Sequence, residues 1–191
     1  MKEIGPVIRI SLLLMIVCGL AYPLALTSIS QAVMPEKSMG SLVYDKKGEA
    51  VGSELIGQPF TDPRYFNSRV SSIGYDASGS ESPNEAPSNP VLLKRVKTSI
   101  EKWKRENPDV PVNQLPIDLV TNSASGLDPD ISPAGAAAQI PRISRLTGIS
   151  KKQLQQLVEV HTKKASMFSE ARVNVLLLNI DLKEKLTSGK S

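Results

Sequence analysis

Residues 10–35 contain no charged side chain, and residues 10–26 are almost entirely apolar. A helix rises about 1.5 Å per residue, so about 20 residues cross the hydrocarbon core of a bilayer. A cleavable signal peptide would have a shorter apolar region, and it would end in an Ala-x-Ala type triplet that is not evident after this stretch. The sequence therefore predicts an uncleaved membrane anchor within residues 1–35, followed by one domain over residues 36–191.

The orientation of the anchor follows from the lengths of its flanks. Lys2 and Arg9 precede the apolar segment, while Lys37, Lys46 and Lys47 follow it, so the positive charges are nearly balanced. The positive-inside rule applies to short loops, and a long flank is translocated largely regardless of its charge. We therefore expect a single-pass plasma-membrane protein with a cytoplasmic N-terminus and an extracytoplasmic domain.

Three residues of the anchor are candidates for contacts with other membrane helices. Ala21 and Ala25 are small residues four positions apart, and such pairs allow two helices to approach closely. Pro23 lies between them and removes one backbone donor, which favours a kink. Ala21, Pro23 and Ala25 are therefore the predicted membrane-helix interface.

Composition excludes several classes of protein. The only cysteine, Cys18, lies in the apolar segment, and His161 is the only histidine, so neither a disulfide framework nor a Cys- or His-based metal site is expected. Aromatic residues make up only 4% of the chain, and the net charge is +4. Nucleic-acid binding is not expected, because basic residues are not interleaved with aromatic ones.

The domain is predicted to be α+β with long loops. A hairpin is expected from residues 42–44 and 49–56, with Gly48 in the turn, and residues 57–90 are too rich in Gly, Pro, Ser and Asn for regular structure. Helix-start signals occur at Asn89 with Pro90, at Ser132 with Pro133, and at Ser150 with Gln153. Pro141 is expected to kink or end the second helix. The patterns at 117–121 and 172–182 favour strands.

The first of these helices, residues 90–106, has an apolar face that is expected to enter the core. Leu93, Val96, Ile100 and Trp103 recur at helical spacing, whereas lysines occupy most of the remaining surface. In the helix after Ser150, His161 lies beside an apolar face and is interpreted as a boundary residue with a satisfied ring, not as a catalytic group.

Catalytic patterns are weak. Ser38 with Met39 follows the anchor as in Ser/Lys membrane peptidases, and residues 99–102 match S-x-x-K, but the accompanying motifs of both families are missing. Phosphate-binding glycine motifs are absent, and Asp128 with Asp130 is more typical of a turn than of a cation site. The residues favour a binding or assembly protein. A membrane-anchored Ser/Lys hydrolase and an isolated extracytoplasmic binding domain are the alternatives.

Six motifs resemble, in order, the C subunit of the Kdp potassium-transporting P-type ATPase. They are GSELIGQ at 52–58, YFNSR at 65–69, PSNP at 87–90, DLVT at 118–121, SGLDPDISP at 125–133 and RVNVLLLN at 172–179. The resemblance covers nearly the whole chain, including the anchor. Two loops, at 80–86 and 122–126, depart from the usual family pattern, so the resemblance does not define their shapes.

The resemblance implies a non-catalytic subunit of a high-affinity potassium pump. Its partners would be a potassium-channel-like subunit, an ATP-hydrolysing P-type subunit, a small membrane subunit and the lipid bilayer. The complex would handle ATP and potassium, with no cofactor bound firmly to this chain. Such subunits are described as catalytic chaperones that raise the ATP affinity of the hydrolysing subunit.

The resemblance also marks individual residues. Gln139 matches a family glutamine linked to nucleotide, although the sequence alone favours an ordinary helix position for it. The family-motif loops contribute a further set of candidate residues: Asn89, Pro90, Gly126, Leu127, Asp128, Pro129, Ser132 and Pro133. An extracytoplasmic domain does not reach cytoplasmic ATP, so any effect on nucleotide affinity is expected to pass through the membrane helix.

Overall fold

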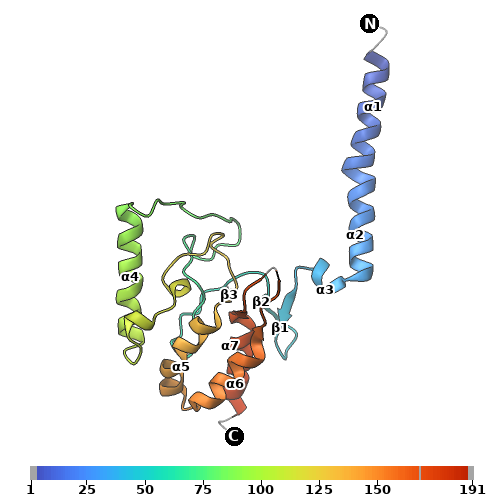
Figure 1. Ribbon diagram of the computed structural model, residues 1–191. Coiled ribbons are helices and arrows are strands. Elements are labelled where there is room, and N and C mark those ends of the chain that lie inside the picture. The colour runs from blue at the N-terminus through green and yellow to red at the C-terminus, as the bar shows by residue number, and fades with distance from the viewer. Residues whose placement is uncertain (1–3, 168, 189–191) are drawn as a thin grey trace. The chain divides into compact units, whose positions relative to one another are not determined.

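A computed structural model describes residues 4–167 and 169–188 of the chain. These residues form a mixed α+β structure, as predicted, and divide into two compact units: one ends at Val51 and the other, the C-terminal unit, begins at Gly52. The helices are α1 (Ile4–Ile16), α2 (Tyr22–Val33), α3 (Pro35–Ser38), α4 (Pro90–Glu106), α5 (Pro133–Thr147), α6 (Lys151–His161) and α7 (Val175–Ser188) (Figure 1). The strands are β1 (Leu42–Tyr44), β2 (Ala50–Ser53), β3 (Asp130–Ile131), β4 (Thr162–Lys163) and β5 (Arg172–Asn174).

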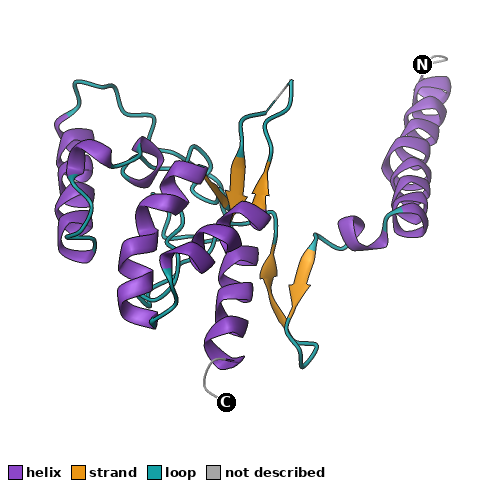
Figure 2. Ribbon diagram, turned by 60° about the horizontal axis from the view of Figure 1, so that its bottom comes forward, coloured by secondary structure: helices purple, strands orange, loops and turns teal. Residues whose placement is uncertain are grey.

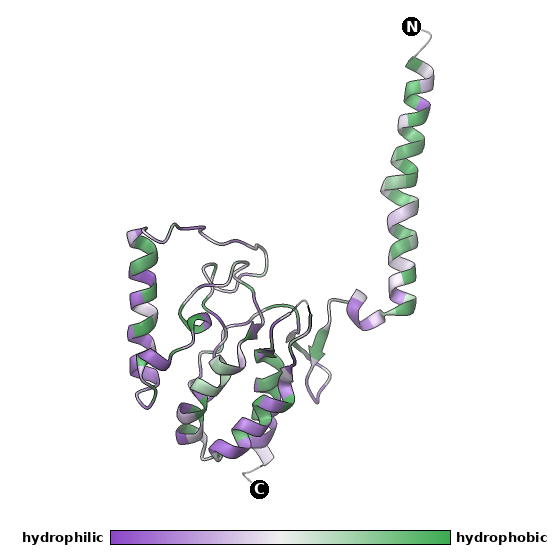
Figure 3. Cartoon of the chain, in the orientation of Figure 1, coloured by the Kyte–Doolittle hydropathy of each residue, from purple (hydrophilic) through white to green (hydrophobic). Residues whose placement is uncertain are grey.

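The anchor is a continuous helix over Ile4–Val33, with a mean hydropathy of 2.2 and none of its most apolar window buried. Its 30 residues are long and apolar enough to cross a membrane. The apolar colour covers most of α1 and α2 in Figure 3, with paler and hydrophilic patches between. The predicted membrane-spanning helix is therefore confirmed as a candidate by length and composition.

A π-helical turn, η1 (Val17–Ala21), lies between α1 and α2 and ends two residues before Pro23. The Tyr22 N–H donates to the Val17 carbonyl, five residues back, in place of the usual four. This wider turn shifts the hydrogen-bond register of the helix close to Pro23, which has no backbone N–H. The expected backbone irregularity at Pro23 thus takes the form of a π turn, with Pro23 in the first turn of α2.

The predicted hairpin forms from β1 and β2. Asp45 organises its turn, because its Oδ1 accepts hydrogen bonds from the Lys47 and Glu49 N–H groups at 2.8 and 3.0 Å. Gly48 has φ +79°, the left-handed conformation that the turn requires. The second strand ends at Ser53 and not, as expected, at residue 56.

The C-terminal unit packs α5, α6 and α7 around a small antiparallel sheet of order β3-β5-β4 (Figure 2). Asp130 pairs with Asn174 and Thr162 with Val173, so β5 is central. The core members are Phe66, Ile131, Ala136, Ile140, Ile143, Leu154, Leu157, Val158, Val173, Val175, Leu178 and Leu182. Only Phe66 in this set comes from the long loop between β2 and α4, which therefore needs other attachments.

The expectation that the apolar face of α4 enters the core is wrong for the first half of the helix. Trp103 is buried, with 6% of its surface exposed, but Leu93 is 59% exposed, and Val96 and Ile100 are half-buried. Figure 1 shows α4 at one side of the C-terminal unit, with α5 between it and α6 and α7. Only the C-terminal turns of α4 are covered, and helical periodicity alone does not distinguish a covered apolar face from an open one.

The strand predicted at 172–182 is also wrong beyond its first three residues. β5 ends at Asn174, and the apolar run continues as α7. The Asn174 side chain caps this helix, since its Oδ1 accepts the Leu177 N–H at 3.2 Å. Nearly every residue from Val175 to Leu182 is buried or half-buried, so the run shows no helical periodicity, and a buried helix looks like a buried strand.

Two further expectations need correction. Residues 117–119 form a 3₁₀ turn, η3 (Ile117–Leu119), and not a strand. Pro141 does not end α5, which continues to Thr147 and stops at Gly148 in the left-handed conformation. The carbonyl that Pro141 leaves without its helical partner belongs to Ala137, which is on the exposed side of the helix where water can replace the lost bond.

The three helix-start signals are confirmed. Asn89 accepts the Val91 N–H, and Ser132 accepts the Gly135 N–H, each at 2.9 Å, with proline in the first turn of both helices. Ser150 and Gln153 form the reciprocal capping box. Local chemistry alone therefore positions the starts of α4, α5 and α6.

Candidate functional site

Side-chain amides fasten the loop between β2 and α4 to the helices of the C-terminal unit. Asn179 of α7 accepts the Phe66 N–H and donates to the Phe66 carbonyl, both at 2.9 Å. Gln139 of α5 makes the same pair of bonds to Asn67, at 2.8 and 3.2 Å. Each side-chain amide therefore bonds the N–H and the carbonyl of one loop residue, as a neighbouring strand would do in a sheet. The successive residues Phe66 and Asn67 are bound in this way by two different helices.

Arg142, one turn after Gln139 on α5, extends this network. Its guanidinium donates to the carbonyls of Pro63 and Tyr65 at 2.8 and 3.1 Å, and to Gln139 Oε1 at 2.6 Å. Its Nε donates to Asn107 Oδ1 at 3.0 Å, which attaches the residue that follows α4. We call Gln139, Arg142 and Asn179 the polar clamp.

Burial makes the polar clamp energetically demanding. Arg142 is 1% exposed, and its burial lowers the pKa of its guanidinium, an effect that Glu106 nearby opposes. A buried cation is tolerated when its donors are bonded. Gln139 is fully buried and uses its oxygen and nitrogen on Asn67, Arg142 and the Gly135 carbonyl. The contacts of Gln139 are therefore those of a positioning residue.

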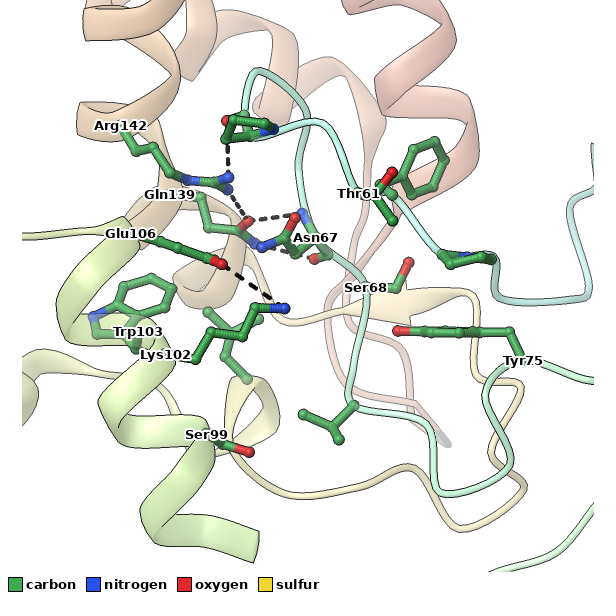
Figure 4. Close-up of a pocket in the computed structure, with 15 residues that line it drawn as sticks. Thr61, Asn67, Ser68, Tyr75, Ser99, Lys102, Trp103, Glu106, Gln139 and Arg142 are labelled. Carbon is green, nitrogen blue, oxygen red and sulfur yellow. Dashed lines mark hydrogen bonds and ion pairs between the residues drawn. The ribbon is translucent and has the colours of Figure 1, made fainter.

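A cavity of about 300 Å³ lies beside the polar clamp, between α4 and residues 59–75. Figure 4 shows Gln139 between Arg142 and Asn67 at one end, with Lys102 and Glu106 of α4 facing the loop side. Lys102 Nζ lies 3.8 Å from Glu106 Oε1, so the charges of the two side chains partly neutralise each other. Ser68 and Tyr75 use their hydroxyls on the carbonyls of Gln58 and Arg69.

A second cluster joins three of the family-motif segments, 52–58, 65–69 and 125–133. Arg69 Nη1 contacts Asp128 Oδ2 at 2.9 Å, and Asp128 Oδ1 accepts the Asp130 N–H at 3.0 Å. Gly57 donates its N–H to the Leu127 carbonyl at 2.7 Å. A Cβ on Gly57 would lie 2.5 Å from the Asp128 carbonyl oxygen, so this crossing of two backbones requires glycine.

Carboxylates complete the attachment of these loops. Asp118 Oδ2 accepts the Ser132 N–H at 2.7 Å, at the start of α5 where a negative charge is favourable. Asp130 pairs with Arg172 at 3.0 Å, although burial raises the pKa of Asp130. Asp128 thus bonds the local backbone, as the interpretation of these residues as a turn predicts, whereas Asp130 begins β3; both carboxylates form ion pairs.

The structure separates the candidate residues by role. Asn89 with Pro90 and Ser132 with Pro133 begin helices, and Gln139 belongs to the polar clamp. Leu127 and Asp128 form the crossing with Gly57, and the Pro129 carbonyl accepts the Val175 N–H. Gly126 has φ +73° and approaches Ile73, so it too is required by the backbone. Ala21, Pro23 and Ala25 lie on the anchor, with their side chains exposed.

The two hydrolase patterns do not form a catalytic dyad. The Ser38 hydroxyl donates to the Pro35 carbonyl at 2.8 Å and is exposed. Lys102, three residues after Ser99, has 63% of its side chain exposed and faces Glu106. A serine nucleophile activated by lysine needs a desolvated amine beside its hydroxyl, and neither serine has that environment.

The only histidine has a structural partner. His161 Nε2 lies 2.7 Å from Asp181 Oδ2, which links the end of α6 to α7. Its side chain is 14% exposed, so the expected boundary position with a satisfied ring is confirmed. Among residues 4–167 and 169–188, no three His, Cys, Asp or Glu side chains gather closely enough to hold a metal ion.

Most of the polar clamp is not evident from the sequence. Asn179 lies in a segment predicted to be a strand, and Arg142 belongs to no recognisable motif. One signal is available, because Gln139 and Arg142 lie three residues apart on a helix of small residues, where long polar side chains on one face need partners. Their loop partners lie 72 to 79 residues away in the sequence, which hides the contacts.

Comparison with known proteins identifies a family and several relatives that are similar to this chain. Residues 4–184 match the family model described as the c chain of K⁺-transporting ATPase. A Bacillus cereus protein named potassium-transporting ATPase KdpC subunit is 58% identical over 183 residues, 95% of each chain. A protein of the same name from Bacillus anthracis is 57% identical over 183 residues, also 95% of each chain.

Proposed function

The chain belongs to the KdpC family, the c chains of K⁺-transporting ATPases, and from this we propose that it acts as the assembly subunit of a potassium pump. The observation that carries the proposal is the extent of the match, which covers the membrane helix and the C-terminal unit together. In this role the chain would stabilise the complex of a potassium-channel-like subunit, an ATP-hydrolysing subunit and a small membrane subunit.

The contacts of the C-terminal unit support a non-catalytic role. Gln139, Arg142 and Asn179 are buried and bonded to backbone groups of one loop, so they fix its shape. The hydroxyls of Ser68 and Tyr75 donate to backbone carbonyls in the same way. Polar side chains used in this manner give a defined surface for docking, and they are not arranged for group transfer.

Assembly within the membrane is proposed to use the face of the anchor that carries Ala21 and Ala25. Both side chains are exposed along a helix of 30 residues that is apolar enough to cross a membrane. Small residues four positions apart allow a partner helix to approach closely enough for backbone contacts. The π turn ending at Ala21 adds a local irregularity to the same face, and such turns are frequent at functional sites.

Replacing Ala21 and Ala25 together with leucine is expected to reduce recovery of the partner subunits with the chain by about tenfold, a loss of about 1.4 kcal/mol in association. Recovery is measured by affinity purification from detergent-solubilised membranes. Ser30→Leu is the matched control, because it adds the same side chain on the opposite face of the helix. Equal recovery for both variants would contradict the proposed interface.

We propose that the N-terminus is cytoplasmic and the C-terminal unit extracytoplasmic, which is motivated by the short and long flanks of the span. In right-side-out membrane vesicles, added protease is expected to digest the C-terminal unit, while in inverted vesicles the unit is protected. A cytoplasmic marker protein provides the control for vesicle integrity. Digestion in inverted vesicles only would overturn this orientation.

The proposed orientation determines how ATP affinity could depend on this chain. An extracytoplasmic unit does not contact cytoplasmic ATP, so the catalytic-chaperone role would operate as a conformational bias passed through the membrane helix. The bonds of Gln139 to Asn67 and Arg142 support this indirect route, because they leave the side chain occupied inside the unit. Gln139 would then affect the pump through the shape of the loop it holds.

A further inference from the structure

The exposed face of α4 concentrates the positive charge of the chain. α4 contains six basic residues, at positions 94, 95, 97, 102, 104 and 105, and two acidic residues, at 101 and 106. Its net charge therefore equals the net charge of +4 of the whole chain, and the remainder of the sequence is neutral in sum. Such a concentration on one helix is a property of α4 and not of the general composition.

The basic residues of α4 divide into paired and unpaired groups. Arg95 is half-buried and pairs with Glu85, and Lys102 faces Glu106 at 3.8 Å. Lys94, Lys97, Lys104 and Arg105 are exposed, and none of these four has an ion-pair partner among residues 4–167 and 169–188. Around the helix, Lys94 lies opposite the buried Trp103, whereas Lys97 and Lys104 lie on one flank, roughly 100–120° from it.

Exposed apolar side chains adjoin the unpaired lysines. Val91 and Leu93, in the first turns of α4, are 60% and 59% exposed. A helix that combines lysines with exposed aliphatic residues on one surface fits the boundary between anionic headgroups and acyl chains. Lysine side chains also extend their ammonium groups towards phosphates while their methylene stems remain on apolar surface.

The membrane helix tethers the unit that carries this surface to the bilayer. A domain of about 140 residues has a radius of gyration of about 14 Å, so each of its faces lies within a few tens of ångströms of the segment that joins it to the span. Tethering makes contact with the bilayer an intramolecular event, which allows individually weak charge interactions to become significant. Each basic residue near an anionic membrane surface contributes a favourable interaction.

We propose that the face of α4 formed by Lys94, Lys97 and Lys104, with Val91 and Leu93, binds the anionic phosphate headgroups of the lipid bilayer. This inference concerns the position of the C-terminal unit on the membrane and holds whether or not the chain raises ATP affinity. Binding to an acidic surface of a protein partner is the competing explanation for the same charges, and the experiment distinguishes the two.

The chain contains a single tryptophan, Trp103, and it lies in α4 itself. Energy transfer from Trp103 to dansyl groups on lipid headgroups therefore reports directly on the distance between α4 and the membrane. The full chain, without partner subunits, is reconstituted in nanodiscs of phosphatidylcholine alone or with about 30% phosphatidylglycerol. Transfer is expected to be at least about twofold higher with the anionic lipid, and to fall to the neutral-lipid level at about 1 M salt, where the screening length is about 3 Å.

Charge-neutral variants identify the face responsible. The triple variant Lys94→Gln, Lys97→Gln and Lys104→Gln is expected to lose the increase produced by anionic lipid. The matched control removes the same charge from other exposed positions on α6 and α7, by Lys151→Gln, Lys152→Gln and Lys183→Gln, and is expected to retain it. Circular dichroism and the Trp103 emission maximum check that both variants are folded.

The outcomes separate the explanations. Transfer that does not change with lipid charge or salt would overturn the proposal. Equal loss in the two triple variants would also overturn it, because net charge and not the α4 face would then be responsible. An increase in transfer that appears only after partner subunits are added would assign the lysines to an acidic protein surface and contradict lipid binding.

Discussion

Arg142→Met is expected to lower the free energy of unfolding of the C-terminal unit by about 3 kcal/mol. The substitution removes four hydrogen bonds from a charged donor to Asn107, Pro63, Tyr65 and Gln139. Bonds to charged groups contribute about 1.5–3 kcal/mol each, whereas burial of the guanidinium costs several kcal/mol. Without Arg142, its acceptors lose this donor, and these include the buried oxygens of Asn107 and Gln139. We therefore expect the loss of the four hydrogen bonds to outweigh the relief of no longer burying the guanidinium.

Denaturant unfolding of the full chain in detergent, followed by Trp103 fluorescence, measures this effect. Trp103 is a suitable probe because its carbonyl accepts the backbone N–H of Asn107, the residue that Arg142 attaches. Arg145→Met is the matched control on the same helix, since Arg145 is 44% exposed and pairs with the exposed Asp109. It should cost less than about 1 kcal/mol. Equal costs for the two variants would show that the polar clamp does not stabilise the unit.

Gly57→Ala is expected to destabilise the same unit by about 2–3 kcal/mol. Its added Cβ would lie 2.5 Å from the carbonyl oxygen and 3.0 Å from the carbonyl carbon of Asp128. Both are backbone atoms, and Asp128 is held further by Arg69, so the loop has little freedom to move aside. The φ of Gly57 is not in the left-handed region, so the cost comes from the contact and not from backbone strain.

The matched control for this substitution is Gly79→Ala. A Cβ added at Gly79 would have no heavy atom of another segment within 4 Å, and the φ of Gly79 is likewise outside the left-handed region. Its effect should be within about 0.5 kcal/mol. The same unfolding measurement applies to both variants. A destabilisation at Gly79 similar to that at Gly57 would indicate that loss of glycine flexibility, and not the crossing of the two loops, is the cause.

Short-range signals in the sequence predicted much of the fold. Asn89, Ser132 and Ser150 each cap a helix through a hydrogen bond to a backbone N–H two or three residues later, so the sequence nearby contains both partners. The anchor was equally accessible, because length and lack of charge suffice to define it. The turn at Asp45 and Gly48 belongs to the same class of local features.

Long-range contacts were not predictable from one sequence. Asn179 is 113 residues from Phe66, and nothing near either residue indicates that they meet. The strand expected at 172–182 failed for a related reason, since burial on all sides of α7 removes the periodicity that identifies a helix. The resemblance to a family located the motifs 52–58, 65–69 and 125–133, but only the structure relates them to one another through Gly57, Arg69 and Asp128.

The proposal that this chain works as a non-catalytic subunit of a potassium pump is tested by affinity purification of the tagged full chain from solubilised membranes. We expect recovery of a multi-span channel-like subunit and an ATP-hydrolysing subunit in constant proportion to the chain. Recovery of the chain alone, together with labelling of Ser38 by a serine-directed probe, would contradict this role and favour a membrane-anchored hydrolase.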